Sequence, residues 1–208
     1  MKKVICILIC IAAALCLLAS CGADGKSGFV RGTVSNNVYC SEFLGLKFSP
    51  GPAWNFDDEG SLMEKSGIDP GTLEDGEELS KALSECASIY DMMAEDPYSG
   101  TSVTVVYENM GLKLGASGTT VEEYVEKLKS EIETRYSSYN AKVTGLDDCS
   151  LGSTTFKSVK VEFEVKGNGL TQYYYVAKTG GYIATVCVSA KPDLDVQTEI
   201  IPLFEPLD

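Results

Sequence analysis

The chain has 208 residues, a net charge of −13 at pH 7 and no histidine. The acidic balance argues against nucleic acid and anionic lipid headgroups as partners, because both bind basic patches. Without histidine, Ser-His-Asp and Cys-His nucleophile systems and His-ligated zinc or iron sites are excluded. We expect a protein that is not an enzyme and that holds no metal ion and no cofactor.

The first 21 residues have the order of a secretory signal. Lys2 and Lys3 precede an apolar run over residues 4–18, shorter than the ~20 residues that span a bilayer. The closing Leu18-Ala19-Ser20-Cys21 resembles the lipobox of bacterial lipoproteins. This resemblance implies cleavage between Ser20 and Cys21, and lipid attachment to Cys21 through a diacylglyceryl group with chains such as palmitate. The alternatives are a transmembrane helix, or an ordinary cysteine beside a plain cleavage site.

We divide the chain into a signal peptide (residues 1–20), a flexible lipid-anchored tether (21–36) and one domain (37–208). The tether is assigned because its residues are rich in Gly, Ser and Asn. Removing the signal takes away two lysines and no acid, so the mature chain has 15 Lys and Arg against 30 Asp and Glu, a net charge of −15. We expect it at the extracytoplasmic face of the cell membrane, where two acyl chains suffice for anchoring.

The first half of the domain predicts short strands, one helix and a hairpin. Acidic residues at its start favour the helix over 77–86, because they lie at the positive end of the helix dipole. A helix could continue through 88–94, but a strand followed by the turn at 97–100 also fits this segment. The expected elements are strands at 38–41 and 44–49, a loop with one helical turn over 57–76, the helix, and a hairpin of strands at 88–94 and 101–109.

The second half predicts the clearest helix and three successive strands. Thr120 and Glu123 form a capping box, and apolar residues recur at helical spacing through residue 136. Alternating apolar and charged residues begin at 155, and glycine turns separate the strands that follow, which is typical of an antiparallel meander. The expected elements are a helix over 120–137, strands at 155–166, 170–178 and 182–190, and a closing helix over 192–204 that Pro202 disturbs.

These elements predict an α+β fold, with a single, mainly antiparallel β-sheet that has helices packed on one face and a polar opposite face. Their order, with Leu44-Gly45-Leu46-Lys47-Phe48, Trp54 and Gly180-Gly181-Tyr182, resembles Gram-positive lipoproteins that have a PsbP/DcrB-like domain. The segment Pro50-Gly51-Pro52-Ala53 departs from the family's Pro-x-Gly-Trp arrangement. The resemblance spans residues 38–204 and implies binding or assembly in the cell envelope rather than catalysis.

Four cysteines remain in the domain after signal removal. They could form two disulfides in any of three connectivities, and Cys149 with Cys187 is the pair expected to lie closest. No Cys-x-x-Cys spacing indicates a redox or zinc motif. We predict that all four are unpaired thiols that pack as small apolar groups: Cys40, Cys86, Cys149 and Cys187.

Candidate binding residues are few. Tyr173 and Tyr175 share one face of their strand and could form an exposed binding surface, although cross-strand packing explains tyrosines in a sheet equally well. The acidic stretches at 57–59 and 74–78 are expected to be solvated, with a weak calcium site as the alternative.

Three functions remain open. The leading hypothesis is a non-catalytic, lipid-anchored cell-envelope protein that binds or scaffolds an envelope protein partner. The second is a receptor lipoprotein for a small ligand or cation. The third is an envelope hydrolase that works through paired carboxylates, which the abundance of acidic residues allows.

Overall fold

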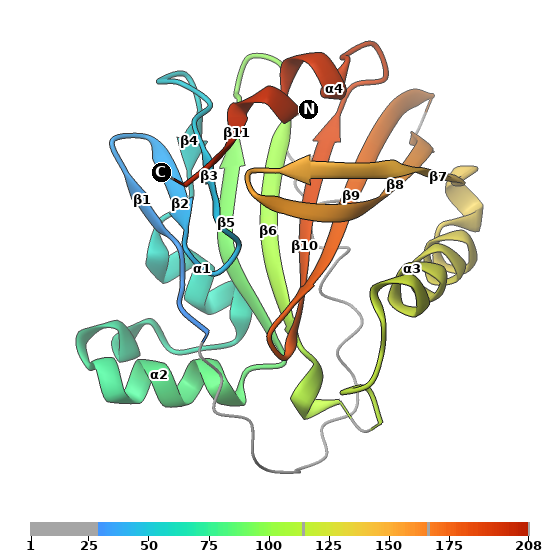
Figure 1. The fold of residues 1–208 in the computed structure, drawn as a ribbon. Helices are drawn as coiled ribbons and strands as arrows, with labels where there is room; N and C mark the ends of the chain where they lie inside the picture. Colours follow the sequence, from blue (N-terminus) through green and yellow to red (C-terminus); the bar gives the residue numbers. More distant parts are fainter. Residues whose placement is uncertain (1–28, 114, 166, 208) are drawn as a thin grey trace.

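The computed structural model describes residues 29–113, 115–165 and 167–207, which form two antiparallel sheets with helices around them (Figure 1). The large sheet has the order β4-β5-β6-β10-β9-β8-β7, and the small sheet has the order β1-β2-β3-β11. The strands of the large sheet are β4 (Asn55–Phe56), β5 (Ser88–Glu95), β6 (Ser102–Asn109), β7 (Lys142–Leu151), β8 (Thr154–Val165), β9 (Asn168–Thr179) and β10 (Tyr182–Ala190). Those of the small sheet are β1 (Thr33–Ser35), β2 (Val38–Ser41), β3 (Leu46–Phe48) and β11 (Phe204–Pro206).

The helices lie at the edges and ends of the large sheet. The α-helices are α1 (Glu59–Ser66), α2 (Gly76–Glu85), α3 (Val121–Arg135) and α4 (Val196–Glu199). Short 3₁₀ turns are η2 (Pro70–Glu74), η3 (Met110–Leu112), η4 (Ser137–Tyr139) and η5 (Ile201–Leu203). Within the described ranges, no helix is both long enough and apolar enough to cross a membrane.

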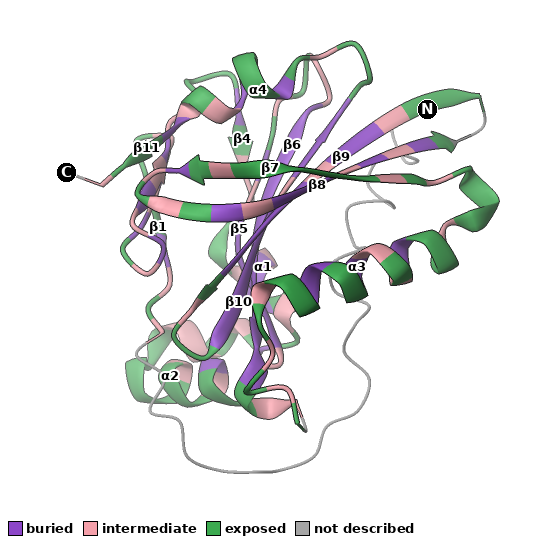
Figure 2. Cartoon of the chain, turned by 45° about the vertical axis from the view of Figure 1, so that its right-hand side comes forward, coloured by how far each residue is buried: buried purple, intermediate pink, exposed green. Residues whose placement is uncertain are grey.

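The expectation of one sheet with a polar face is wrong, because a second sheet covers that face. Phe48 and Phe204 of the small sheet share a hydrophobic cluster with Val105 and Tyr107 of β6. On the opposite face, α1 packs against β5, and α3 packs against β8 and β9. Every residue of β6 is therefore buried, and Figure 2 shows burial along the central strands and along the sheet-facing side of α3.

Most of the long elements agree with the sequence prediction. The β5–β6 hairpin, the β8–β9–β10 meander and the capping box of α3 are all present. Residues 88–94 form a strand and do not extend the preceding helix. The loop expected over 57–76 contains an eight-residue helix, α1, which Asp58 caps by accepting a hydrogen bond from the Ser61 N–H.

Two elements differ from the prediction. Strand β7 was not expected, because its residues are mostly exposed and show no apolar alternation. The expected closing helix is wrong: residues 196–203 form only two short turns, after which β11 pairs with β3. The chain can form this strand because Pro202 ends helical hydrogen bonding and Phe204 gains a buried position beside Phe48.

The folded part begins earlier than residue 37. The Phe29 ring lies 4.9 Å from the Tyr107 ring and 5.1 Å from the Phe43 ring, measured between centroids. Strand β1 then pairs with β2 across a turn in which Asn36 and Asn37 have φ values of 50° and 63°. Residues 29–36, which we assigned to the tether, therefore belong to the fold, while Ser20 and Cys21 lie outside the described residues.

Candidate functional site

A buried charged cluster lies between the small sheet and β5. The pairing of β5 with β6 shifts register between Tyr90 and Met92, so that Asp91 is an extra residue in the strand. Its fully buried carboxylate accepts hydrogen bonds from the Tyr39 hydroxyl (2.5 Å) and from the Gly32 N–H (2.9 Å to Oδ2). The Nε of Arg31 lies 3.4 Å from Asp91 Oδ1. This cluster fixes the N-terminal segment to the core.

Burial dominates the electrostatics of this cluster. Removal from water raises the pKa of Asp91, and the Tyr39 hydroxyl, the Gly32 N–H and the Arg31 charge oppose that rise. Burial, with the nearby Asp91 charge, also raises the pKa of Tyr39, so Tyr39 keeps its proton and remains a donor. The side chain of Arg31 is 10% exposed, and its Nε has no hydrogen-bond partner.

A groove of about 320 Å³ lies beside this cluster, between the N-terminal segment and α2. One wall is formed by residues 29–33, so Arg31 and Gly32 belong both to the cluster and to the groove. Val30 is 56% exposed. The rest of the lining comes from α1, η2 and α2: Glu59, Leu73, Gly76, Leu79, Ser80 and Leu83.

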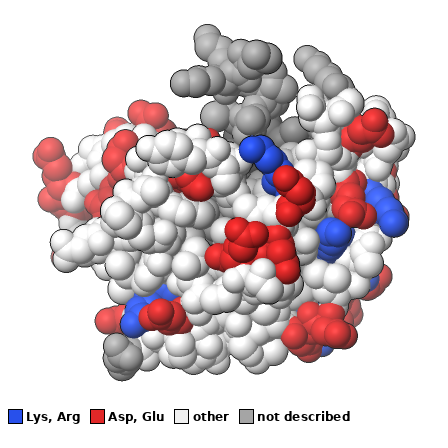
Figure 3. All heavy atoms as spheres, turned by 90° about the horizontal axis from the view of Figure 1, so that it is seen from above, with Lys and Arg blue, Asp and Glu red and all other residues white. Residues whose placement is uncertain are grey.

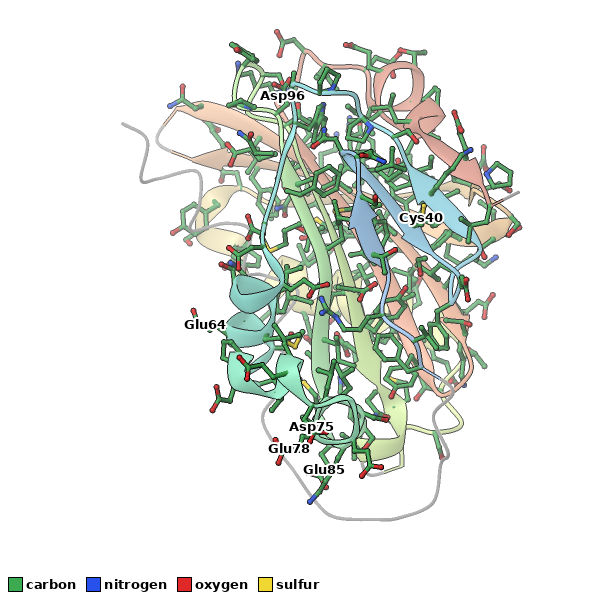
Figure 4. The ribbon with its side chains drawn as sticks, turned by 90° about the vertical axis from the view of Figure 1, so that its left-hand side faces the viewer. Cys40, Glu64, Asp75, Glu78, Glu85 and Asp96 are labelled. Atoms are coloured by element: carbon green, nitrogen blue, oxygen red, sulfur yellow. The ribbon has the colours of Figure 1, made fainter. Side chains whose placement is uncertain are left out.

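The segment that supplies the second wall of the groove is strongly acidic, and Glu59 lines the groove itself. Residues 57–85 contain ten Asp and Glu against two Lys, a net charge of −8, compared with −13 for the whole chain. Figure 4 shows Glu64 on α1, and Asp75, Glu78 and Glu85 at α2. On the opposite end of the molecule, carboxylates also outnumber cations, but lysines are interspersed among them (Figure 3).

These acidic residues have local roles. Asp75 caps α2 by accepting from the Glu77 N–H at 2.8 Å, and Asp57 pairs with Lys65 at 3.0 Å. Within the described ranges, no group of three or more Asp, Glu, Cys or His side chains is placed to hold a metal ion.

A second polar cluster joins α3 to β6. Glu108, only 2% exposed, accepts a hydrogen bond from the Tyr124 hydroxyl at 2.6 Å and pairs with Lys113. The adjoining hollow is about 60 Å³, too small for a substrate. Glu108 faces α3, whereas Asp91 faces the small sheet. The two buried carboxylates of the described chain therefore lie on opposite faces and form no acid pair.

The tyrosines chosen from the sequence are largely covered. Tyr175 is fully buried and its hydroxyl accepts a hydrogen bond from Gln197 Nε2 at 3.1 Å, so it supplies no exposed binding surface. Its face is occupied by the cluster that includes the small sheet, which the sequence did not predict. Tyr173 is partly buried, with Lys160 Nζ 6.0 Å from its ring centroid.

In the part of the chain that the structure describes, none of the four cysteines of the domain forms a disulfide. Cys149 packs in the cluster beneath the small sheet, whereas Cys187 packs in the cluster beneath α3, so the pair expected to lie closest is on opposite faces of the large sheet. Burial raises the pKa of the Cys187 thiol to about 12.

We expect iodoacetamide to modify all four domain cysteines when the unreduced protein is unfolded, and to modify Cys187 slowest in the folded protein at pH 8. The reason is that the thiolate reacts, and burial keeps Cys187 protonated. Mass spectrometry of the peptides measures both results, with a reduced sample as the control. A deficit of two or four alkyl groups in the unreduced sample would show disulfides instead.

The sequence matches no protein-family model and no curated protein. Among solved structures, the chain is similar to the cyanobacterial PsbP (CyanoP) of Synechocystis, with a TM-score of 0.48, 13% identity, and 89% of this chain and 98% of that one covered. LpqN of Mycobacterium tuberculosis, described as involved in cell envelope biogenesis, gives a TM-score of 0.36 at 9% identity, with 76% of each chain covered. These similarities concern the arrangement of elements only, and we base no functional argument on them.

Proposed function

We propose that this chain is a non-catalytic lipoprotein, held at the extracytoplasmic face of the cell membrane by a diacylglyceryl group on Cys21, that binds or scaffolds an envelope partner. The proposed anchor rests on Leu18-Ala19-Ser20-Cys21 after an apolar signal. The non-catalytic part is supported by the separation of the two buried carboxylates, each of which is engaged by its own neighbours.

The observation that carries the proposal is the position of Phe29. Its ring contacts the rings of Phe43, Tyr107 and Tyr182, so Phe29 is part of the packed fold. Seven residues lie between Cys21 and Phe29, and the eight Cα-to-Cα steps across them span at most about 28 Å when fully extended. A lipid on Cys21 would therefore keep the groove between residues 29–33 and α2 close to the membrane. A partner at the membrane surface would be within reach of this end.

The Cys21→Ser variant is expected to lose acylation and stay as an uncleaved precursor or as a different membrane species. The fold should remain intact, because Phe29 is the first residue that contacts the core among those described. Metabolic labelling with a palmitate analogue, followed by mass spectrometry of the mature N-terminus, measures the change. Diacylglycerol on the mature Cys21→Ser protein would mean that Cys21 is not the anchor.

Crosslinking in intact cells followed by purification tests the binding part of the proposal. The matched control is an unrelated soluble domain fused to residues 1–28, which reproduces the anchor alone. We expect at least one envelope protein to be enriched over this control. Equal recovery from the two samples would contradict a scaffolding role.

A small-ligand receptor is the second candidate, and the groove is the observation that favours it. Its volume of about 320 Å³ is at the lower end of the range for ligand pockets. A thermal-shift screen of the full chain with metabolites and cations distinguishes this function, because a specific ligand stabilises the folded state in a saturable way. The hydrolase alternative is the least favoured, since no facing pair of buried acids is found in the described chain.

A further inference from the structure

The groove between the N-terminal segment and α2 has apolar side chains on both walls, beside polar ones. Leu73, Leu79 and Leu83 line it from η2 and α2, and Val30 lines it from the opposite wall. Val34 lies four residues after Val30 and is 42% exposed, so two β-branched side chains in this part of the chain are accessible to water. Covering such an apolar surface with a side chain of a partner lowers the free energy of the system.

Arg31 gives the groove a buried hydrogen-bond donor. Its side chain is nine-tenths buried, Arg31 lines the groove, and its buried Nε has no hydrogen-bond partner. Asp91, 3.4 Å from Nε, balances the positive charge. The Nε–H of Arg31 is therefore a buried donor that lacks an acceptor, while the charge of Asp91 leaves little net attraction to an anion.

The negative charge near the groove favours a partner that carries positive charge. Residues 57–85 carry a net charge of −8, and Glu59 lines the groove itself. This field repels phosphates, carboxylates and anionic headgroups, and attracts lysine and arginine side chains. An extended peptide supplies backbone carbonyl oxygens for Arg31, an apolar side chain for the leucines, and basic side chains for the acidic rim.

We propose that this groove docks an extended, lysine- or arginine-rich peptide segment of a membrane partner, with one apolar side chain of that segment inserted between the N-terminal segment and α2. The inference rests on the proposed function, because only seven residues lie between Cys21 and Phe29, so a lipid on Cys21 would keep the groove near the membrane surface. The groove, the buried Arg31 and the acidic rim support it independently of the anchor.

A photoreactive p-benzoylphenylalanine at Val30 in the full-length chain tests the inference in living cells. The matched control carries the same group at Tyr98, which is 85% exposed in the β5–β6 turn. Asp96 of this turn lies at the opposite end of the molecule from α2 in Figure 4. We expect adducts from position 30, and not from position 98, with a protein segment in which Lys or Arg flanks an apolar residue. Mass spectrometry of the crosslinked peptides identifies the segment.

Ser80 supplies a matched pair of charge variants. It is an exposed residue of α2 that lines the groove, and both lysine and glutamate suit a helix. Ser80→Lys is expected to lower the adduct yield from position 30 about fivefold, because a like charge then faces the basic segment. Ser80→Glu should retain or raise the yield. Equal melting temperatures of the two variants show that folding is unchanged.

Several results would overturn the inference. These are adducts with lipid alone, adducts with an acidic segment, no adduct beyond that of position 98, or equal yields from Ser80→Lys and Ser80→Glu. Membrane fractionation of the same samples distinguishes a failure of the proposed docking site from a failure of the proposed lipid anchor. Protein that remains lipidated but gives none of the expected adducts contradicts the docking site alone, whereas unlipidated protein contradicts the proposed anchor.

Discussion

Replacing Asp91 by alanine is expected to lower the free energy of unfolding by about 3–5 kcal/mol, because its carboxylate accepts two hydrogen bonds and pairs with Arg31 inside the core. The variant leaves the Tyr39 hydroxyl and the Gly32 N–H without their acceptor, and leaves the Arg31 charge without its counter-ion. Loss of the carboxylate also releases residues 29–33, which form one wall of the groove. Urea denaturation followed by intrinsic fluorescence measures the change.

The control for this prediction is Asp193→Ala, which removes an exposed acid after β10 and should leave the urea midpoint unchanged. The double variant Arg31→Met/Asp91→Ala should cost less than the sum of the two single changes, because it removes both charges together. A midpoint for Asp91→Ala equal to that of Asp193→Ala would show that the cluster contributes nothing to stability.

Replacing Gly152 by alanine is the second change with a large expected effect, a loss of about 2–5 kcal/mol in the free energy of unfolding. Gly152 turns β7 into β8 with φ of +60°, which costs an alanine about 1–2 kcal/mol. Its added Cβ would also lie 2.5 Å from Leu46 Cβ and 2.8 Å from the Gly45 carbonyl oxygen. This backbone cannot move away without displacing β3, so overpacking adds about 1–3 kcal/mol.

Gly167→Ala is the matched control, because Gly167 has φ of +78° and no atom within 4 Å of an added Cβ. It should show the cost of the left-handed backbone alone. The difference between the two urea midpoints therefore measures the contact between the β7–β8 turn and the small sheet. Equal losses of stability in the two variants would mean that the small sheet moves away from the added Cβ without a loss of free energy.

The candidate groove could not have been found from the sequence, although part of its signal is visible there. Asp91 interrupts the apolar run Ile89-Tyr90-Asp91-Met92-Met93, and an acid in such a strand predicts a buried partner. The partner, Arg31, lies sixty residues earlier in a segment rich in Gly and Ser that looks like a linker. The register shift in β5 and the β1–β2 pairing bring them together, and neither has a local pattern.

Local rules predicted the elements whose stabilising contacts lie close together in the chain. The capping box and apolar stripe of α3 and the glycine turns of the β8–β10 meander are of this kind, and both are confirmed. Residue spacing also predicted correctly that Tyr173 and Tyr175 share one face of their strand. It could not say that Tyr175 is buried, because the covering sheet is built from both ends of the domain.

By itself, the sequence determined the charge, the absence of histidine, the order of the main strands and α3, and the signal-like first 21 residues from which we predict the anchor. Only the tertiary structure decided that residues 29–36 pack with the domain, that a second sheet covers the first, and that Arg31 meets Asp91 beside a groove. Composition and periodicity indicate only those interactions that join residues close together in the chain. The pairing of β11 with β3 and the burial of Asp91 are stabilised by contacts between segments that lie far apart in the chain.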